Sequence, residues 1–538
     1  MKFSTNIHPL ADNKDWEALK NSIDISKRLR IVSTLIEQLK ALSATYVLIE
    51  NEYIDRDFSA SFSEFYSTVF KRHNKFCRRM HFFKSDLGKI FAQHDSPEII
   101  SRSIQTAADN GEYLGFVVVR PIAHAPIGSA VIKFSHLHAN LVAHLLVKAR
   151  YEVHLLGATL SVDGIPLTQQ DSRVGSCAQA SIWMAGRHFH TRHRGKWFST
   201  VDITKAATQL GEFGLSRALP AGSEFLGVNN MVQALRALDQ EPLTYAALDK
   251  KGNWGPLRPY DVINRYVDSG IPVILGLRNS GTIGHAVVVT GHVIKKVDEK
   301  VKLPKEPTRA ELCEAFLVND DQRGGNLLMP IEGSSKYGET EYSVLKDIEY
   351  IIVPLPNKVF TPAEHAEKMA WSLLNYYRSK WEDFKKAYTD TLGTSAACGD
   401  DFVKHIDQNT VLSRTYLTYG WKYKARMLKN CIGSDFKKIL LYQEFPRFVW
   451  VTEFGTLPSL NHLNFKQRRV FGHAVIDATG SKHWGSACMF HAPGAGYRFI
   501  PNDADIFGGY QMAFTPITDD RGYFPKLRSE DNFESYTI

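Results

Sequence analysis

The chain has 538 residues, of which 44% are hydrophobic, 23% charged and 12% aromatic. These proportions are typical of globular proteins, and they exclude a disordered, collagen-like or long coiled-coil chain. Lysine and arginine exceed the acidic residues by 65 − 57 = 8, an excess too small over this length to argue for a nucleic-acid partner.

Cysteine use and the N-terminus bear on the compartment. The six cysteines are Cys77, Cys177, Cys313, Cys398, Cys431 and Cys488. No two of them are separated by two residues, so neither a secreted disulfide scaffold nor a structural zinc site is favoured. The N-terminus lacks the apolar core of a signal peptide, and no apolar run is long enough to cross a bilayer. We expect a cytoplasmic protein without a membrane span, metal or cofactor.

Residues 1–165 mix helical and strand patterns and predict an α+β N-terminal accessory domain. Helices are expected at 25–42, 61–72 and 137–150, and strands at 46–49, 115–121 and 130–134. Asp163-Gly164 lies between apolar residues, and this dipeptide favours a two-residue hairpin turn. Nothing in this region converges on a chemistry.

Residues 166–356 carry the informative patterns. A helix is expected to begin at Cys177, and another to cover 228–238. Strands are expected at 272–277, 285–291 and 316–319. The segment 295–309 mixes both charge signs with two prolines, so it is interpreted as a solvated loop rather than a basic recognition arm.

Residues 357–538 predict a second α+β accessory domain. Its first helix is expected after a Thr361 cap, with one apolar stripe from 369 to 388 and an end at Gly393. Strands follow at 438–442, 448–454, 470–477 and 487–491.

Three residues of the middle region together suit nucleophilic catalysis. A thiol reacts as thiolate, which a helix N-terminus and a neighbouring imidazole both favour, and an acid must then orient the imidazole. Cys177 stands at the expected start of a helix, His285 opens an expected strand, and Asp320 follows another. We therefore predict a Cys177–His285–Asp320 site.

This middle third resembles the papain-like cysteine peptidase superfamily, and most closely its bacterial branch of bacteriocin-leader-processing peptidases. The matching segments are GSCAQASIWM, VNNMVQALRAL, YVDSGIPVILGL, GHAVVVTGH and FLVNDDQRGG. The resemblance implies a papain-like catalytic domain over residues 166–356, flanked by the two accessory regions. Neither flank resembles a family that we can name.

The resemblance also implies a role for each residue. Cys177 is the nucleophile, His285 the general base and then acid, and Asp320 the orienting acid, with Asp321 as the alternative since the two carboxylates point oppositely if the strand continues. Gln170 or Gln169 supplies an oxyanion-hole amide, although Gln170 lies one residue further from the cysteine than is usual in the family. The backbone N–H of Cys177 supplies the other donor.

The implied activity is hydrolysis of peptide or isopeptide bonds in a protein substrate through a thioester. A transglutaminase-type acyltransferase uses the same triad, and an inert papain-like binding protein is a third possibility. The flanking regions suit a regulatory partner.

Two further groups of residues resemble functional sites. His188, His190 and His193 suggest a metal cluster, but no pair four residues apart completes it, so an exposed helix end is favoured. His473, Asp477 and Cys488 repeat the catalytic residue types, but Cys488 lies in an expected strand where nothing lowers the pKa of a thiol.

Overall fold

The computed structural model describes residues 5–88, 91, 96–135, 141–171, 176–208, 226–249, 252–278, 284–295, 303–334, 336–430, 433–460, 467–480, 487–501, 510–517 and 522–523. Gly175, Cys431 and residues 296–302 of the charged segment lie outside these ranges. Within them, every helix is too short or too polar to pass through a membrane. The five described cysteines form no disulfide.

The fold is a mixture of helices and antiparallel sheets, which confirms the predicted α+β class. The chain divides into two compact units. Unit 1 contains Met1–Gly255, Pro272–Val293 and Ala315–Leu355, and unit 2 contains Pro256–Ile271, Ile294–Glu314 and Pro356–Ile538. The division into three domains at 165 and 356 stays a prediction.

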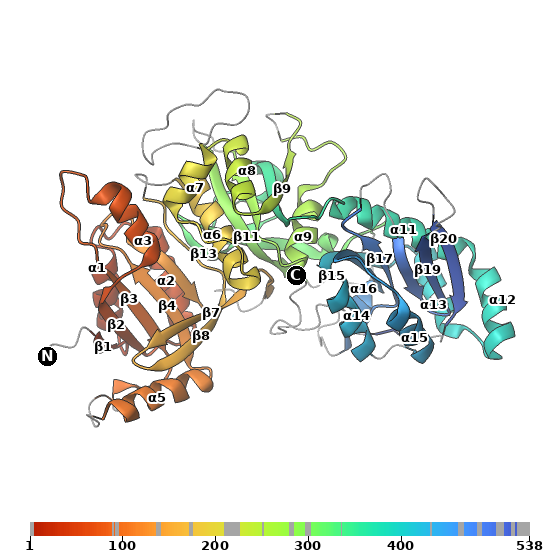
Figure 1. The fold of residues 1–538 in the computed structure, drawn as a ribbon, viewed down its shortest axis with the longest axis horizontal. Helices are drawn as coiled ribbons and strands as arrows, with labels where there is room; N and C mark the ends of the chain where they lie inside the picture. The colour runs from red at the N-terminus through yellow and green to blue at the C-terminus, as the bar shows by residue number, and fades with distance from the viewer. Residues whose placement is uncertain are drawn as a thin grey trace. The chain divides into compact units, whose positions relative to one another are not determined.

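Unit 1 begins with a five-stranded antiparallel sheet in the order β1-β2-β3-β4-β5 (Figure 1). Its strands are β1 (Thr5–Pro9), β2 (Tyr46–Tyr53), β3 (Cys77–Phe83), β4 (Tyr113–Val119) and β5 (Ile127–Ile132). The accompanying helices are α1 (Asn13–Ile23), α2 (Arg30–Ala41), α3 (Arg56–Ser61), the π-helix η1 (Phe62–Tyr66) and α5 (Pro97–Asp109). The predicted helices at 25–42 and 61–72 are therefore shorter than expected.

A hairpin of β7 (Ala149–Leu155) and β8 (Ala158–Gly164) replaces two predicted features. The helix predicted at 137–150 is wrong, because its described end forms β6 (Val142–Leu145) and the start of β7. The turn predicted at Asp163-Gly164 is also wrong, since both residues pair within the hairpin. The turn falls instead at Leu156 and Gly157, whose φ angles of 47° and 85° are those of a type I′ turn.

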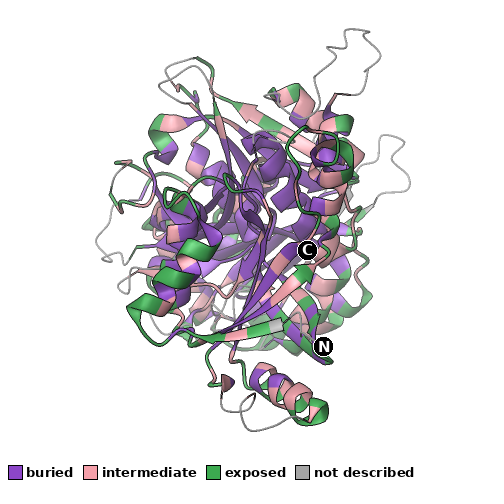
Figure 2. Cartoon of the chain, turned by 90° about the vertical axis from the view of Figure 1, so that its left-hand side faces the viewer, coloured by how far each residue is buried: buried purple, intermediate pink, exposed green. Residues whose placement is uncertain are grey.

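The second sheet of unit 1 has seven strands, in the order β13-β12-β11-β10-β14-β9, with β6 paired to β11. Its strands are β9 (Gln240–Ala246), β10 (Val273–Leu277), β11 (His285–Ile294), β12 (Cys313–Asp320), β13 (Gly324–Pro330) and β14 (Ile348–Pro356). Helices α6 (Cys177–His193), α7 (Thr200–Ala207) and α8 (Val228–Ala237) pack together, and α6 contacts β10; α10 (Val344–Asp347) precedes β14. Figure 2 shows the buried strands enclosed by partly exposed helices.

Unit 2 holds a six-stranded antiparallel sheet in which neighbouring strands follow one another in the chain. Its strands are β15 (Val411–Tyr419), β16 (Phe448–Thr456), β17 (Gly472–Asp477), β18 (Ala487–Ala492), β19 (Ala495–Pro501) and β20 (Tyr510–Pro516). The helices are α9 (Pro259–Asp268), the 3₁₀ helix η2 (Arg309–Leu312), α11 (Ala363–Ser379), α12 (Trp381–Leu392), α13 (Ala397–Asp407), α14 (Gly420–Lys429), α15 (Ser434–Tyr442) and α16 (Leu457–Leu460).

Two predictions for unit 2 need correction. The strand predicted at 438–442 is the end of α15, which buries Phe436 and Leu440 one helical turn apart. The helix predicted from Thr361 to Gly393 is two helices, α11 and α12, separated at Lys380. Thr361 does not cap a helix, because its hydroxyl donates to the Gly480 carbonyl at 2.6 Å. Gly393, with φ of 67°, ends α12 as predicted.

Candidate active site

Cys177 is the first residue of α6, the helix that runs through the interior of unit 1. The residue before it, Ser176, occupies the N-cap, where its backbone N–H and hydroxyl donate to Gln179 Oε1 at 3.1 and 2.6 Å. The thiol therefore lies at the positive end of a well-defined helix dipole. Only 8% of Cys177 is exposed.

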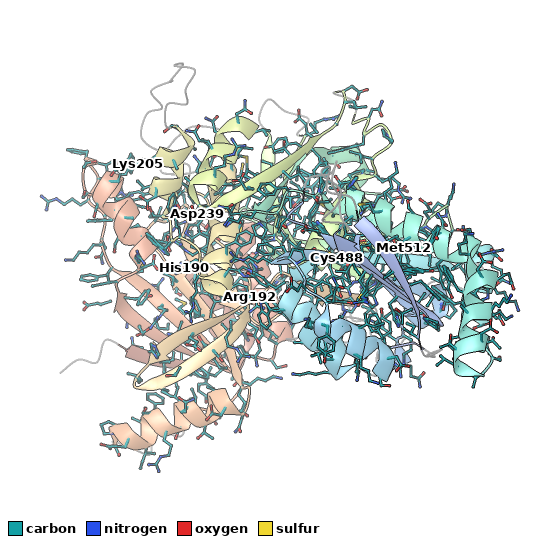
Figure 3. The ribbon with its side chains drawn as sticks, turned by 45° about the vertical axis from the view of Figure 1, so that its right-hand side comes forward. His190, Arg192, Lys205, Asp239, Cys488 and Met512 are labelled. Carbon is teal, nitrogen blue, oxygen red and sulfur yellow. The ribbon has the colours of Figure 1, made fainter. Side chains whose placement is uncertain are left out.

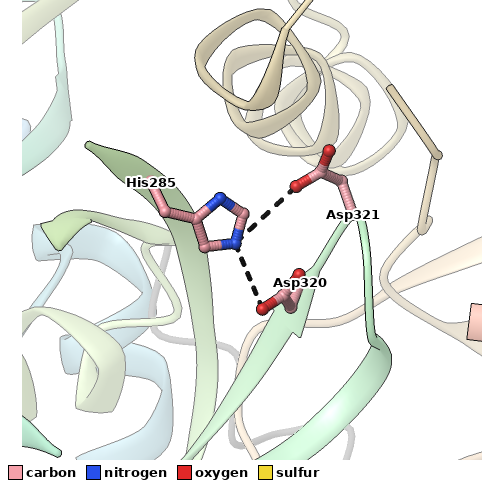
Figure 4. Close-up of side chains that lie close together, drawn as sticks. All are labelled: His285, Asp320 and Asp321. Atoms are coloured by element: carbon pink, nitrogen blue, oxygen red, sulfur yellow. Dashed lines mark ion pairs between the residues drawn. The ribbon is translucent and has the colours of Figure 1, made fainter. Parts of the chain in front are cut away.

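His285 is the first residue of β11 and reaches the thiol from the sheet. Cys177 is near enough to this ring to raise the pKa of His285, and the thiol sulfur lies 4.0 Å from the carbonyl oxygen of the preceding Gly284. Its Nε2 forms an ion pair with Asp320 Oδ2 at 3.1 Å (Figure 4). The imidazole thus lies between the sulfur and a carboxylate.

Asp320 ends β12 and is fully buried. Its Oδ2 accepts from Tyr342 at 2.8 Å as well as from His285, and its Oδ1 accepts the backbone N–H groups of Gln322 and Arg323 at 2.9 and 3.2 Å. Four donors saturate the four lone-pair sites of the carboxylate. Burial alone would raise the pKa of Asp320, but the His285 bond and charge outweigh it and lower that pKa.

The imidazole is stabilised in its charged form. Burial alone would lower the pKa of His285, but its hydrogen bonds to Asp320 and Cys177 and the charges of two carboxylates raise it to about 11. The site therefore favours an imidazolium beside the sulfur.

Asp321 approaches the same nitrogen without bonding to it. Because β12 ends at Asp320, the two carboxylates do not point oppositely, and Asp321 Oδ1 lies 3.9 Å from Nε2 (Figure 4). Complete burial, helped by the charge of Asp320, raises the pKa of Asp321 to about 7, although the His285 charge and the Gln170 backbone N–H oppose this rise. Distance and charge both favour Asp320 as the orienting acid.

The two candidate glutamines differ in their surroundings. Gln169 Oε1 accepts the Ile127 N–H of β5 at 3.3 Å, so this side chain is bound to the first sheet. Gln170 is half-buried, and its backbone lies beside Asp321. Which amide completes an oxyanion hole stays a prediction.

Two tyrosines of the site carry no signal in the sequence. Tyr342 holds Asp320 from a loop, 22 residues away in the chain. Tyr350 of β14 lies flat over Gly276, where an added Cβ would come within 2.0 Å of its ring. Burial raises the pKa of Tyr350 to about 12, and the charge of Cys177 contributes to the rise. Only the pairing of β14 with β10 brings Tyr350 to the thiol.

One group of described side chains could hold a metal ion, and it consists of His285, Asp320 and Asp321, with ligand atoms within 4.8 Å of one another. Three of the four acceptor sites of Asp320 are already taken by Tyr342 and two backbone N–H groups, which leaves at most one site for a cation. The residues therefore fit a hydrogen-bonded triad better than a metal centre.

The predicted rivals lie elsewhere. His188 is buried rather than at an exposed helix end, because α6 is covered on all sides as far as Phe189. His190 and Arg192 lie at the end of that helix (Figure 3), where His190 Nδ1 bonds to the Gly195 carbonyl at 2.7 Å.

The second Cys-His-Asp set lies in unit 2. Tyr423 and Tyr523 each bond to one nitrogen of His473 at 2.5 Å, and burial lowers the pKa of that histidine. Cys488 lies in β18 (Figure 3), where burial, together with the charge of Asp477, raises the pKa of its thiol to about 12. These side chains are part of the buried core of unit 2, and nothing in their surroundings activates the Cys488 thiol.

No model of a known protein family and no curated protein matches this chain. The assignment of a function therefore depends on the chemistry of the residues themselves.

Proposed function

We propose that the chain is a cysteine peptidase with a papain-like catalytic domain, in which Cys177, His285 and Asp320 form the triad. The observation that carries the proposal is the position of one imidazole, whose Nε2 lies 3.1 Å from a buried carboxylate and whose pKa is raised by the neighbouring thiol at a helix N-terminus. If His285 had only a structural role, there would be no reason for a thiol at a helix N-terminus to lie beside it.

Each residue then has a defined step. The Cys177 sulfur attacks a peptide carbonyl carbon, and the resulting oxyanion is held by the Cys177 N–H and a glutamine amide. His285 gives its proton to the departing amine as the C–N bond breaks, which leaves a thioester on Cys177. Water, deprotonated by His285, hydrolyses the thioester and releases the acid and the free thiol. Asp320 keeps the ring oriented throughout.

The substrate class follows from this chemistry and is a peptide or isopeptide bond in a protein. A transglutaminase-type enzyme differs only in the last step, where an amine replaces water. An inert binding protein would keep the geometry without turnover. A cytoplasmic location belongs to the same proposal.

The test compares Cys177→Ala with a control variant, Cys488→Ala, which removes a thiol outside the proposed site. We expect the wild-type chain and Cys488→Ala to react with a cysteine-directed covalent probe at the residue that mass spectrometry maps as Cys177. We expect both proteins to release new N-termini from a denatured protein substrate, and Cys177→Ala to do neither.

The outcomes separate the three classes. Incorporation of a labelled primary amine without new N-termini would identify an acyltransferase. Probe labelling without turnover in either assay would identify an inert domain. Labelling that persists in Cys177→Ala and is lost in Cys488→Ala would overturn the assignment of the nucleophile.

A further inference from the structure

Helix α2 packs against β13 and lies beside the loop that precedes α10. Gln38 Nε2 donates to the Gly325 carbonyl at 2.6 Å, and this buried bond fixes α2 on the sheet. The segment 338–342, which we call the 338–342 loop, ends in Tyr342, the residue that donates to Asp320. Because α2 and this loop both belong to unit 1, contacts between them can influence the acid of the proposed triad.

Arg30 joins α2 to the 338–342 loop. It is the first residue of the helix, and its Nη2 donates to the carbonyl oxygens of Gly338 and Glu339, each at 2.9 Å. Gly338 has a φ of 70°, a left-handed conformation that glycine adopts readily, so the chain can turn at this point. The start of the loop is thereby held to α2.

A cavity of about 220 Å³ lies between α2, β13 and the start of this loop. On the loop side it is lined by Gly338 and Glu339, and on the β13 side by Asn326 and Leu327. The α2 residues that line it are all polar, namely Arg30, Ser33, Thr34, Glu37 and Gln38. The two hydrogen bonds of Arg30 therefore hold the loop across a space that apolar side chains do not fill.

The end of the loop holds the oxygen of Asp320 that faces the imidazole. The Tyr342 hydroxyl donates to Oδ2 at 2.8 Å, and His285 Nε2 lies 3.1 Å from the same atom. Between the two ends, Thr340 Oγ1 lies 3.0 Å from the Leu328 carbonyl oxygen and 3.2 Å from that of Tyr342. The loop is thus a short segment with internal bonds, and a displacement of its start is passed on to its end.

A row of alternating charges forms a second link from α2 to the acid. Arg30 Nη1 lies 3.8 Å from Glu341 Oε1, and Glu341 Oε2 lies 2.7 Å from Arg323 Nη2. Arg323 Nε in turn lies 3.9 Å from Asp320 Oδ2. The Glu341 side chain is 74% exposed, so water screens this link, and we expect it to contribute less than the Tyr342 hydrogen bond.

Both links begin at Arg30 and end at the same oxygen of Asp320. We propose that Arg30 is a positioning residue for the orienting acid, which it holds against the imidazole through the 338–342 loop. This inference rests on the proposed triad. It gives residues 1–165, which contribute no member of the triad, a defined influence on the site.

The test measures the rate at which a cysteine-directed covalent probe labels Cys177 in the full-length chain. We expect Arg30→Met to slow labelling by at least about twofold, which corresponds to a weak coupling within one hydrogen-bond network. Arg28→Met is the control and should label as the wild type does, because Arg28 is exposed in the same segment and its guanidinium bonds to no other described residue. Arg30→Lys, which keeps the charge but not the planar fork, should label at an intermediate rate.

A comparison in the Tyr342→Phe background separates positioning from general destabilisation. If Arg30 acts through the Tyr342 hydroxyl, Arg30→Met should slow labelling much less in this background than in the wild type. Equal slowing in both backgrounds, or unchanged labelling of the folded Arg30→Met protein, would overturn the inference. Should Arg30→Met fail to fold, Arg30→Lys takes its place in both comparisons.

The same experiment distinguishes this inference from the proposed function. Labelling requires the activated thiol but no peptide cleavage, so a chain that labels without releasing new N-termini would contradict the peptidase and still test Arg30. Absence of Cys177 labelling in the wild type would overturn the triad and this inference with it. Cleavage by the wild type together with unchanged labelling of Arg30→Met would overturn this inference alone.

Discussion

Asp320 and Asp321 are neighbours in the chain and both lie near the His285 imidazole, yet their carboxyl groups differ in hydrogen bonding and in pKa. Asp320 receives four hydrogen bonds and keeps its charge, whereas Asp321 is buried with little compensation, and the pKa of its carboxyl is raised to about 7. A carboxylate must be satisfied on all sides to remain ionised in a protein interior. The two residues are of the same type, so the difference between their pKa values comes from the hydrogen-bond donors around each carboxyl group.

Replacing Asp320 by Asn should destabilise the protein in a pH-dependent way. The folded chain retains the His285 proton up to about pH 11, whereas the unfolded chain loses it near pH 6.5. The stability from this protonated histidine is therefore complete below pH 6.5 and is lost as the pH rises towards 11. We expect Asp320→Asn to lower the free energy of unfolding by about 1.5–3 kcal/mol near pH 6.

Urea unfolding at several pH values measures this loss. The difference between wild type and Asp320→Asn should shrink steadily above pH 6.5. Asp407→Asn, which removes an exposed partner of Arg378, is the control and should change little. A difference that grows with pH would contradict the assignment of a charged His285–Asp320 pair.

Tyr342 positions the acid, so Tyr342→Phe should weaken the site without removing it. The variant loses the hydroxyl that donates to Asp320 Oδ2 at 2.8 Å. A bond to a charged group is worth about 1.5–3 kcal/mol, and we expect a loss of that size in unfolding free energy. Probe labelling of Cys177 should slow but persist. Unchanged stability would show that the hydroxyl does not support the acid.

At the scale of elements, the pairing of β10 with β14 decides what surrounds the thiol. Gly276 and Tyr350 lie opposite each other in this pairing, and the tyrosine ring occupies the space where a side chain at 276 would stand. Glycine is required here by close approach and not by backbone conformation. The Tyr350 ring therefore forms one edge of the site, and it can do so only because residue 276 is a glycine.

Gly276→Ala should therefore displace Tyr350 and disturb the site. Its Cβ would lie 2.0 Å from the ring, closer than any real contact. Forced overpacking costs about 1–3 kcal/mol, and we expect a lower Tm and altered probe labelling of Cys177. Adding Tyr350→Ala should restore much of the stability, because the clash is then gone. Gly186→Ala in α6, with 3.4 Å to Leu238, is the control. If the stability losses of Gly276→Ala and Tyr350→Ala simply added in the double variant, the proposed clash would be contradicted.

At the scale of the whole molecule, each compact unit has a core of its own. One buried cluster, which includes Phe58, Tyr113 and Val162, lies in unit 1, and another, which includes Leu412, Val451 and Met489, lies in unit 2. Separate cores allow local opening of one unit while the other stays closed. Glu453, which accepts from Arg414, Arg426 and the Tyr416 hydroxyl, belongs with these partners to unit 2.

Glu453→Gln should consequently destabilise unit 2 selectively. It removes a fully buried charge that three side chains share, and breaking a buried ion pair costs about 3–5 kcal/mol. Hydrogen exchange followed by mass spectrometry should rise in the peptides of unit 2 and stay unchanged in those of unit 1. Probe labelling of Cys177 should also be unchanged. Equal increases in both units would show that they unfold together.

The elements that could be predicted from sequence are those with a local cause. Strands 448–454, 470–477 and 487–491 are apolar and bounded by turn residues, and all three are confirmed. The end of α12 at Gly393 is likewise local, because only glycine readily takes the left-handed conformation found there. Segments 137–150 and 438–442 failed because short apolar runs fit both helix and strand, and pairing or burial decides between them.

The sequence by itself determined that Cys177 begins a helix, that His285 begins a strand and that a strand runs up to Asp320, since these depend on neighbours in the chain. Only the tertiary structure decided that the three meet and that Asp320 bonds to the imidazole rather than Asp321. It also brought Tyr342 and Tyr350 to the site. Hydrogen-bond satisfaction and burial depend on residues far apart in sequence, and no local pattern encodes them.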